Sequence, residues 1–294
     1  MNVVISHIIG GLGNQMFQYA AGRALSLEYG VPLRLDVSGF AGYGLHQGFE
    51  LQRVFNCPGE IAAEAEVRGI LGWQYSSVIR RVVSRPGMAA FRRKGFVVEP
   101  FFSYWPDICR IPKDSYLFGY WQSDKYFQAH APVIRADFAF KSPLADKNAE
   151  LGEQIGRENA ISLHVRRGDY VKNPKTTATH GLCSPEYYQS AIQYVIDRVE
   201  RPSFYIFSDD PAWVRENMKI KYPSVYVDHN LGAESYNDMR LMSMCRHHII
   251  ANSSFSWWGA WLNSSTDKIV VAPKHWFAIE KDAKDLLPQS WVRL

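Results

Sequence analysis

The residues most suggestive of chemistry are an arginine pair and a serine-rich segment, each directly after a short apolar run. Arg166 and Arg167 follow ISLHV (161–165), and NSSFS (252–256) follows HHIIA (247–251). Arginine can bind phosphate through two parallel hydrogen bonds, and the free N–H groups at the start of a helix favour an anion. Together these segments predict a pyrophosphate site that needs no metal.

Strand periodicity separates the two arginines. Side chains of a strand alternate between its faces, so His164 and Arg166 share one face and Arg167 lies on the other. We therefore expect His164 and Arg166 to reach the site and Arg167 to serve the structure. Each residue also has a plainer interpretation, such as an ion pair between Arg167 and Asp169 or a helix cap at Ser254. Their joint position at consecutive strand ends favours a site.

Two adjacent acids, Asp209 and Asp210, follow the apolar run FYIFS (204–208). A carboxylate pair can hold a divalent cation, but no other acids cluster with it. Asp210 before Pro211 is also typical of a helix cap. We therefore expect no essential metal and no other cofactor.

A glycine-rich loop, GGLG (10–13), follows the first apolar run and precedes a helix-like segment. It is not a dinucleotide fingerprint, because Met16 stands where the third glycine belongs. The loop either lets backbone approach a ligand, with Asn14 and Gln15 as polar groups, or is simply a tight turn.

Alternating elements in the second half would position these residues. Apolar runs predict strands at 161–165, 204–208, 225–228, 247–251 and 268–272. Helices are expected from Ser184, Asp210, Ser235 and Ser254. Strands that alternate with helices predict βαβ units, a parallel sheet and an α/β fold, with ligands at the carboxyl ends of the strands.

The first half is less periodic. It predicts strands at 3–9 and 32–36, a helix at 14–29 and a helix-prone segment at 60–85. The polar segment KSPLADKN (141–148) predicts a boundary between domains 1–145 and 146–294.

Composition bounds the class of protein. The chain has 294 residues, 47% of them hydrophobic, which suits one large or two modest globular domains and excludes disorder as the dominant state. Four scattered cysteines without metal-binding spacing argue against a disulfide scaffold and a zinc site. No nucleic-acid-binding signature is present.

Charge is unevenly spread. Residues 67–98 carry +7 and no acid, which leaves −3 for the rest of a chain whose total is +4. A solvated basic helix face is one interpretation, and contact with a membrane surface or an anionic glycan is the other. The first residues lack the basic region of a signal peptide and no apolar run is long enough to span a membrane. We therefore expect a cytoplasmic protein, with peripheral contact at the inner face of the membrane through 67–98 as the alternative.

Four segments resemble the α-1,2-fucosyltransferases, glycosyltransferase family 11. They are GGLGNQMFQYA (10–20), GYWQSDKYF (119–127), HVRRGDYV (164–171) and NSSFSWWGAWL (252–262). The resemblance implies a GT-B-like α/β fold, with two Rossmann-type halves whose parallel sheets face a central cleft. It also implies inverting transfer of L-fucose from GDP-β-L-fucose to the 2-hydroxyl of a terminal galactose. GDP-fucose and a galactose-terminated oligosaccharide are thus the expected partners.

Related α-1,6- and protein O-fucosyltransferases imply residue roles. By this resemblance Arg166 holds the β-phosphate, His164 and Asp238 contact guanine, and Asn14 approaches the sugar. The rest of the expected donor site consists of Gly11, Gly13, Asn252, Ser253, Ser254, Phe255 and Ser256.

The catalytic base is the least determined role. Asp169 is the first choice because it follows the arginine pair, although it could instead orient an arginine. The acceptor half offers Asp36, His46 and Glu50 as alternatives. Trp121 is a candidate aromatic surface for a sugar, and core packing is the plainer interpretation of such aromatic groups. Two other functions stay open: a GDP-fucose-dependent enzyme with another acceptor, and a non-catalytic sugar-nucleotide-binding protein.

Overall fold

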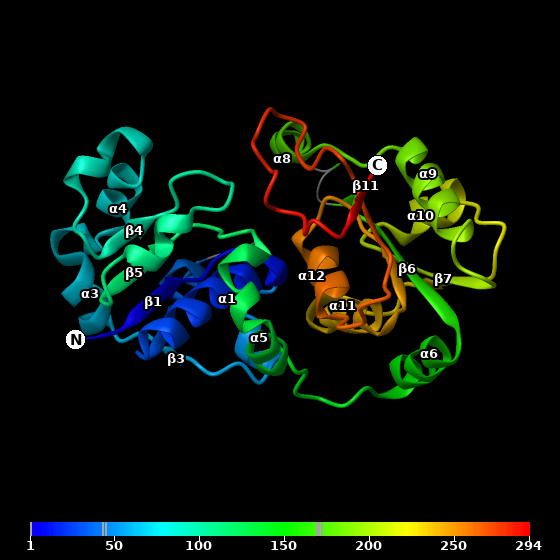
Figure 1. Ribbon diagram of the computed structural model, residues 1–294, viewed down its shortest axis with the longest axis horizontal. Coiled ribbons are helices and arrows are strands. Elements are labelled where there is room, and N and C mark those ends of the chain that lie inside the picture. The colour runs from blue at the N-terminus through cyan, green and yellow to red at the C-terminus, as the bar shows by residue number, and fades with distance from the viewer. Residues whose placement is uncertain (1, 43, 45, 169–170, 172) are drawn as a thin grey trace. The chain divides into compact units, whose positions relative to one another are not determined.

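The computed structural model describes residues 2–42, 44, 46–168, 171 and 173–294, and the chain divides into two compact units (Figure 1). The first unit comprises the chain up to Lys141 together with Lys284–Leu286, and the second comprises Ser142–Ala283 and Leu287–Leu294. The observed boundary lies at 141/142, where the sequence predicts 145/146. The return of Lys284–Leu286 to the first unit has no signal in the sequence.

The returning segment is anchored through Asp285. Its carboxylate accepts a hydrogen bond from the backbone N–H of Tyr104 at 3.2 Å and pairs with Lys125 at 2.5 Å. Its backbone oxygen accepts from the Ser123 hydroxyl at 2.6 Å. These contacts fix three residues to a unit that the chain left more than 140 residues earlier.

The first unit is built on a five-stranded sheet in the order β3-β2-β1-β5-β4, with every pairing parallel. Val4 in the central strand pairs with Leu33 on one side and Ser115 on the other. The strands are β1 (Val4–His7), β2 (Leu33–Asp36), β3 (Glu60–Ile61), β4 (Phe96–Val98) and β5 (Ser115–Phe118).

Helices cover both faces of this sheet. Ser6 of β1 donates a hydrogen bond to the Gln18 carbonyl of α1 (Leu12–Tyr29). On the opposite face, Ile5 packs in one buried cluster with residues of α3 (Glu64–Leu71) and α4 (Ser77–Val83). The short helices α2 (Leu51–Val54) and α5 (Ala131–Asp137) complete the unit. The helix-prone segment 60–85 thus contains two α-helices, α3 and α4, with a 3-10 helix over Gly72–Tyr75 between them, and its first two residues pair with β2 as a strand.

The second unit contains six parallel strands in the order β11-β10-β9-β6-β7-β8. With β6 as the first strand this is the doubly wound 3-2-1-4-5-6 order of a Rossmann fold. The strands are β6 (Asn159–Val165), β7 (Pro202–Ser208), β8 (Ser224–Val227), β9 (His247–Ile249), β10 (Val270–Ala272) and β11 (Val292–Arg293).

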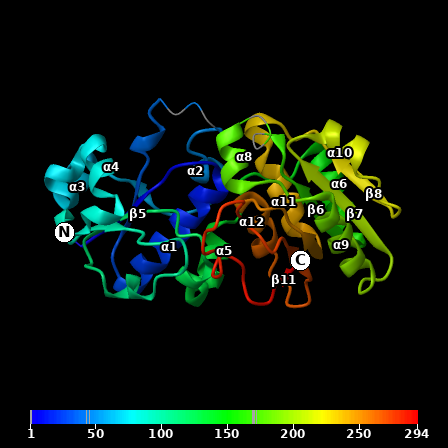
Figure 2. The same ribbon diagram turned by 90° about the horizontal axis from the view of Figure 1, so that it is seen from above.

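Side-chain alternation divides the core of this unit in two. Leu163 and Ile206 lie in the cluster with α9 (Pro185–Ile196) and α10 (Pro211–Asn217). Tyr205 and Phe207 lie in the cluster with α6 (Asp146–Arg157) and α11 (Tyr236–Met244). Figure 1 shows α9 and α10 on one side of β6 and β7, with α11 and α12 (Ser254–Leu262) on the other, and Figure 2 shows the same elements from above. A last helix, α8 (Pro174–His180), follows the β6 loop.

The predicted α/β class with parallel sheets in two Rossmann-type halves is confirmed. Two helix starts in the second unit have the predicted caps: Ser184 accepts from the Tyr187 N–H and Asp210 from the Trp213 N–H, both at 3.3 Å. The cap of α12 is Ser253 and not Ser254, and Ser235 makes no side-chain capping bond at the start of α11. Within the described ranges, none of the helices combines the length and apolarity needed to cross a bilayer.

Candidate functional site

Each sheet has a point at which the strand order reverses, and ligands of open α/β sheets bind there, beyond the carboxyl ends of the strands. In the second unit this point lies between β6 and β9, where Leu163 pairs with Ile249. The loop after β6 and the start of α12 therefore lie at one edge. We call residues 164–168 and 251–256 the second switch point.

The side chain of Arg166 lies at this switch point and pairs with an acid. Its guanidinium lies 3.2 Å from the carboxylate of Asp209, which follows the neighbouring strand β7. The other oxygen of Asp209 accepts the backbone N–H of Arg167 at 2.8 Å. A Cβ at Gly168 would stand 2.9 Å from that carboxylate, so glycine is required for this approach. Asp209 thus fixes both the loop and its arginine.

Charge balance keeps Asp209 ionised. Burial by itself would raise the pKa of Asp209, but the charge of Arg166 and the N–H groups of Gly168 and Arg167 outweigh it and hold the pKa below its usual value. A fixed guanidinium at this edge is suited to a phosphate.

Arg167 turns to the opposite face. Its guanidinium lies over the ring of Trp213, 4.0 Å from the centroid, and 3.4 Å from the carboxylate of Asp210. Its observed acidic partner is Asp210, whereas Asp169 lies outside the described residues. Both acids of the Asp209–Asp210 pair are thus engaged by arginine. Among the described residues no group of three or more His, Cys, Asp or Glu is placed to hold a metal ion.

His164 is buried beside Arg166 with an unsatisfied ring atom. Its Nδ1 has no hydrogen-bond partner within the described part of the chain, and its ring lies 6.0 Å from that of Phe255 on α12. Burial and, second, the charge of Arg166 lower the pKa of His164 well below its usual value. His164 is therefore neutral, and an orphaned buried atom of this kind calls for a ligand partner.

Asp238 belongs to a polar network at the start of α11. Its carboxylate accepts from the Asn230 amide at 2.8 Å, and Asn230 exchanges hydrogen bonds with Asn148 of α6 at 2.8 and 3.0 Å. His229 bonds the same Asn148 at 2.9 Å. Burial raises the pKa of Asp238 to about 7, although the Asn230 bond works against it. The sequence gives no signal for Asn148, because 82 residues separate it from Asn230.

The side chains of the NSSFS segment mostly build their own loop. Asn252 donates to the carbonyls of His180 at 2.8 Å and Trp276 at 3.2 Å. Ser253 caps α12 by accepting the Phe255 N–H at 3.3 Å. Ser256 donates to the Ser253 carbonyl at 3.3 Å. The Ser254 hydroxyl forms no hydrogen bond to any residue the structure describes, so it and the helix N-terminus are the groups left for an anion.

The first unit has its own switch point, between β1 and β5. We call residues 8–14 and 119–122 the first switch point. Here the side-chain amide of Gln122 donates to the side-chain amide oxygen (Oδ1) of Asn14 at 2.7 Å, across 108 residues of chain. Gln18 joins the two loops by accepting the Ile9 N–H and donating to the Gly119 carbonyl. Gln122 was not a candidate from the sequence, and its bond to Asn14 makes it one.

Backbone strain marks the same loop. Trp121 has a φ of +56°, rare for a bulky side chain, and its buried Nε1 has no hydrogen-bond partner among the described residues. The Glu99 carboxylate accepts the N–H groups of Tyr120 at 2.7 Å and Trp121 at 2.9 Å. Glu99 thus holds the strained turn that presents Gln122.

The acids predicted on the acceptor side are already engaged. Asp36 accepts from the Tyr116 hydroxyl, from Arg80 at 3.3 Å and from the Ser38 N–H at 2.9 Å. Burial opposes ionisation of Asp36, but the bonds from Tyr116 and Ser38 bring its pKa below the usual value. Asp36 is therefore a poor proton acceptor.

Glu50 and His46 differ in their surroundings. Glu50 is buried and pairs with Arg53 at 2.7 Å; burial raises its pKa although Arg53 lowers it. His46 lies against Gly11, where an added Cβ would come within 3.4 Å of the ring. Of the predicted acceptor-side residues, His46 is thus placed beside the first switch point, whereas the Glu50 carboxylate is held by an arginine. The prediction that Trp121 offers an aromatic surface to a sugar is wrong, because its side chain is fully buried and packs edge-on against Tyr126.

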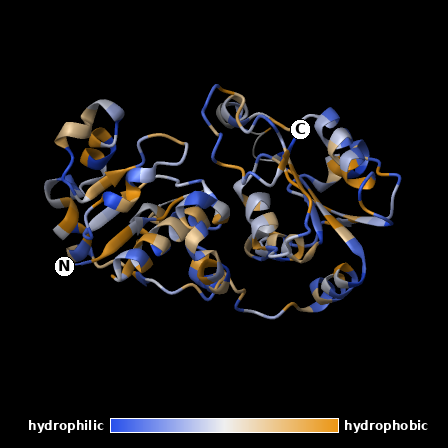
Figure 3. Cartoon of the chain, viewed as in Figure 1, coloured by the Kyte–Doolittle hydropathy of each residue, from blue (hydrophilic) through white to orange (hydrophobic). Residues whose placement is uncertain are grey.

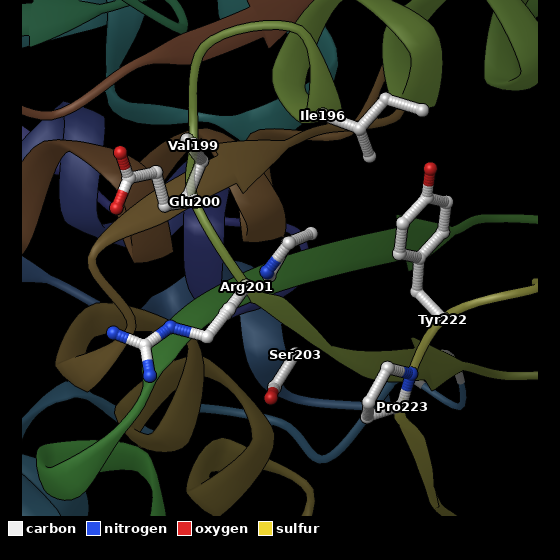
Figure 4. A pocket seen from close by; sticks show the side chains of 8 residues that line it. Ile196, Val199, Glu200, Arg201, Ser203, Tyr222 and Pro223 are labelled. Atoms are coloured by element: carbon white, nitrogen blue, oxygen red, sulfur yellow. The ribbon is translucent and has the colours of Figure 1, made fainter.

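A shallow pocket elsewhere in the second unit is separate from these groups. Figure 4 shows it lined by Ile196, Val199, Glu200, Arg201, Ser203, Tyr222 and Pro223. It lies at the amino-terminal end of β7, whereas the second switch point lies at the carboxyl ends of the strands. It therefore contributes nothing to the site.

The chain is similar to known glycosyltransferases. The profile of Glycosyl transferase family 11 matches residues 99–294. The α-1,2-colitosyltransferase of Escherichia coli is 37% identical over 297 residues, covering 100% of this chain and 99% of the relative. The O-antigen biosynthesis glycosyltransferase WbnK of Escherichia coli is 36% identical, in a match that covers 98% of this chain and 99% of the WbnK chain.

Among solved structures, the fucosyltransferase NodZ from Bradyrhizobium has a TM-score of 0.53 at 15% identity. The match covers 88% of this chain and 91% of NodZ. The predicted GT-B-like fold class is thereby confirmed at the level of the fold.

Proposed function

Because the chain belongs to glycosyltransferase family 11, we propose that it transfers L-fucose from GDP-β-L-fucose to the 2-hydroxyl of a terminal galactose, with inversion to an α-1,2 linkage. The observation that carries the proposal is the second switch point, where Arg166 is fixed by Asp209 beside neutral His164 and the start of α12. Such a site suits a nucleoside diphosphate. NodZ, which shares the fold, has been soaked with GDP-fucose.

The donor would lie with its pyrophosphate between Arg166 and the N-terminus of α12. The unpartnered Nδ1 of His164 and the Asp238 carboxylate would meet polar atoms of the guanine. A carboxylate can accept two N–H groups of guanine, which adenine does not offer, so Asp238 would select the base. These contacts also need no metal ion.

The reaction would proceed by displacement at the sugar C1. The bond from C1 to the β-phosphate oxygen breaks, GDP leaves with the electron pair, and the galactose 2-oxygen bonds to C1 from the opposite side. Arg166 and the helix N-terminus offset the charge that develops on GDP, and preorganised donors of this kind contribute ~10²–10³-fold each. By the family resemblance Asn14, whose side chain accepts a hydrogen bond from Gln122, would contact the sugar.

The galactose hydroxyl must also lose a proton. Asp169 remains our proposed base, and Glu50 is a weaker alternative because Arg53 engages it. In Asp169→Asn we expect turnover to fall ~10²-fold or more with GDP affinity nearly unchanged. A joint loss of turnover and GDP affinity would instead assign Asp169 to orienting the arginines, and a selective loss in Glu50→Gln would move the base to the acceptor side.

A second donor sugar is favoured by a specific observation. The α-1,2-colitosyltransferase is similar over the whole chain. Colitose is L-fucose without its 3-hydroxyl, so the two donors present the same pyrophosphate and the same C1 to the residues above. Discrimination would then depend on a group that bonds the 3-hydroxyl.

One experiment separates the candidates. GDP release is measured with GDP-fucose and with GDP-colitose, each with and without lactose, and NMR identifies the linkage of the product. Lactose-dependent release from GDP-fucose with a 1,2-linked product supports the proposal, and preference for GDP-colitose supports the second donor. GDP binding without release with any galactoside would support the binding-protein alternative, and loss of GDP affinity in EDTA would contradict the metal-free site.

A further inference from the structure

Four large apolar side chains stand exposed close together in the first unit. They lie in the 3-10 helix η2 (Gly72–Tyr75), in α4, and in the 3-10 helix η3 (Pro86–Phe91). Trp73 is 57% exposed, Val78 70%, Val82 40% and Phe91 61%. Such residues scattered singly are ordinary, but four within nineteen positions mark an interaction surface.

The cations of the same segment fall into two groups. Three are used inside the unit. Arg80 is buried against Asp36, Arg68 pairs with Glu64, and Arg92 donates to the carbonyls of residues 83–85. The other four, Arg81, Arg85, Arg93 and Lys94, are exposed and form no ion pair with any residue the structure describes. The segment thus presents four unneutralised charges to solvent.

The geometry of α4 places both kinds of residue together. Positions three and four apart share a helix face, so Val78, Arg81 and Val82 point outward. Arg85 is exposed just beyond the end of the helix, in extended backbone. The inward face carries Val83, which packs in the buried cluster with α3 and β4, and Arg80. The outward face therefore mixes apolar groups with positive charge and contains no acid. Figures 1 and 3 show α3 and α4 together at one end of the first unit, beyond β4.

We propose that this surface, which we call the basic-apolar surface, docks the protein on an anionic lipid bilayer. Aromatic and aliphatic groups enter the headgroup region while arginine and lysine meet the lipid phosphates. The charge of the basic-apolar surface favours a bilayer over a protein partner. Its four cations, which pair with no acid among the described residues, match a uniformly negative lipid surface, whereas the surface of an ordinary protein carries both signs of charge. The assignment does not depend on the reaction that the switch points perform.

The test measures co-sedimentation of the full chain with vesicles. We compare phosphatidylcholine vesicles with vesicles in which roughly one lipid in three is phosphatidylglycerol. Binding is expected only to the anionic vesicles and is expected to weaken with salt. Each cation near such a surface contributes about fivefold, so Arg81→Gln/Arg85→Gln should lower the partition constant about twenty-five-fold. Trp73→Ser/Phe91→Ser should lower it several-fold without changing the net charge.

Matched controls use exposed residues of the second unit. Lys219→Gln/Lys221→Gln removes the same charge elsewhere, and Ile279→Ser removes an exposed apolar side chain. Both should bind vesicles like the wild type, and all variants should keep the circular dichroism and GDP affinity of the wild type. The proposal is overturned by equal binding of Arg81→Gln/Arg85→Gln and wild type, or by failure of the wild type to bind anionic vesicles at low salt. The proposal is also overturned if the wild type sediments as a dimer and Trp73→Ser/Phe91→Ser sediments as a monomer, because the surface would then serve self-association.

Discussion

The two switch points share a backbone design and differ in charge. Each lies where the strand order of a parallel sheet reverses, between β1 and β5 in one unit and between β6 and β9 in the other. The second presents an ionised pair, Arg166 with Asp209, and a helix N-terminus. The first presents a neutral amide pair, Asn14 with Gln122, on a strained turn.

This difference shows how one topology can present two kinds of binding chemistry. A fixed cation and free N–H groups stabilise an anion, and their effect extends over several ångströms. Neutral amides act only at hydrogen-bond distance and match a polyhydroxyl compound, which offers donors and acceptors without charge. The topology supplies the place, and the side chains at the loop ends supply the chemistry.

The largest expected effect comes from removing the cation. Arg166→Ala should weaken GDP binding ~10- to 150-fold, the equivalent of one charge-assisted hydrogen bond, and lower turnover ~10²–10³-fold. Calorimetry with GDP and steady-state kinetics measure the two losses. The matched control is Arg167→Ala, which loses its contacts with Trp213 and Asp210 and should lower the melting temperature with little change in GDP affinity. Equal GDP affinity in wild type and folded Arg166→Ala would contradict the assignment of Arg166 to phosphate.

A smaller effect is expected at the neutral pair. Asn14→Ala and Gln122→Ala each remove one uncharged hydrogen bond, so kcat should fall ~2- to 12-fold while GDP affinity stays the same. Because Gln122 is proposed to act through Asn14, kcat of the double variant should be only slightly lower than kcat of Asn14→Ala alone. Additive losses in this double-mutant cycle would show that Gln122 acts independently.

Ionic strength separates the two regions without mutation. Added salt screens the attraction between GDP and Arg166, so GDP affinity should fall several-fold between low and physiological salt. The KM for a neutral galactoside should not change over the same range. A salt-dependent galactoside KM would mean that charge also contributes at the first switch point.

The smallest effect concerns pH and Asp238. Its pKa of about 7 lies above the usual 3.8, so the folded state binds more protons than the unfolded state between these values. The free energy of unfolding therefore falls as pH rises from about 4 to 7. Asp238→Asn keeps an oxygen that accepts from Asn230 and removes the buried charge. Its melting temperature should therefore exceed that of the wild type by a few degrees at pH 8, and the two melting temperatures should match near pH 4.

Asp228 provides a control of opposite sign. Its hydrogen bond with Arg215 lowers its pKa, so it stabilises the fold above its usual pKa and loses that contribution as pH falls. Asp228→Asn should therefore be less stable than the wild type at pH 8 and equal to it in strong acid. Parallel pH profiles for the two variants would contradict the raised pKa of Asp238.

The sequence predicts the second unit better than the first, for local reasons. Caps such as Ser184 and Asp210 act on N–H groups three residues away, so their signal is contained in a short window. The helix predicted from Ser254 to Leu262 is observed with the same bounds. In contrast, β3 is a two-residue edge strand that pairs with β2, and the segment EIAAEAE (60–66), with which it begins, favours a helix.

The candidate site shows the same limit. The placement of His164 and Arg167 on opposite faces follows from a period of two within one strand. The bond between Arg166 and Asp209 requires that β6 and β7 be neighbours, and that between Asn14 and Gln122 joins loops 108 residues apart. Contacts of this kind depend on the assembled sheet and leave no local pattern.

The contacts of Asp285 affect the folding of hybrid proteins whose two units come from different relatives. The chain crosses between the two units three times, at 141/142, 283/284 and 286/287. A hybrid with a single junction at 141/142 would take its first unit from one parent and the Asp285 segment from the other. The partners of that segment, Ser123 and Lys125, would then face a foreign sequence. Hybrids that carry residues 284–286 with their own first unit should therefore fold better than hybrids with a single junction.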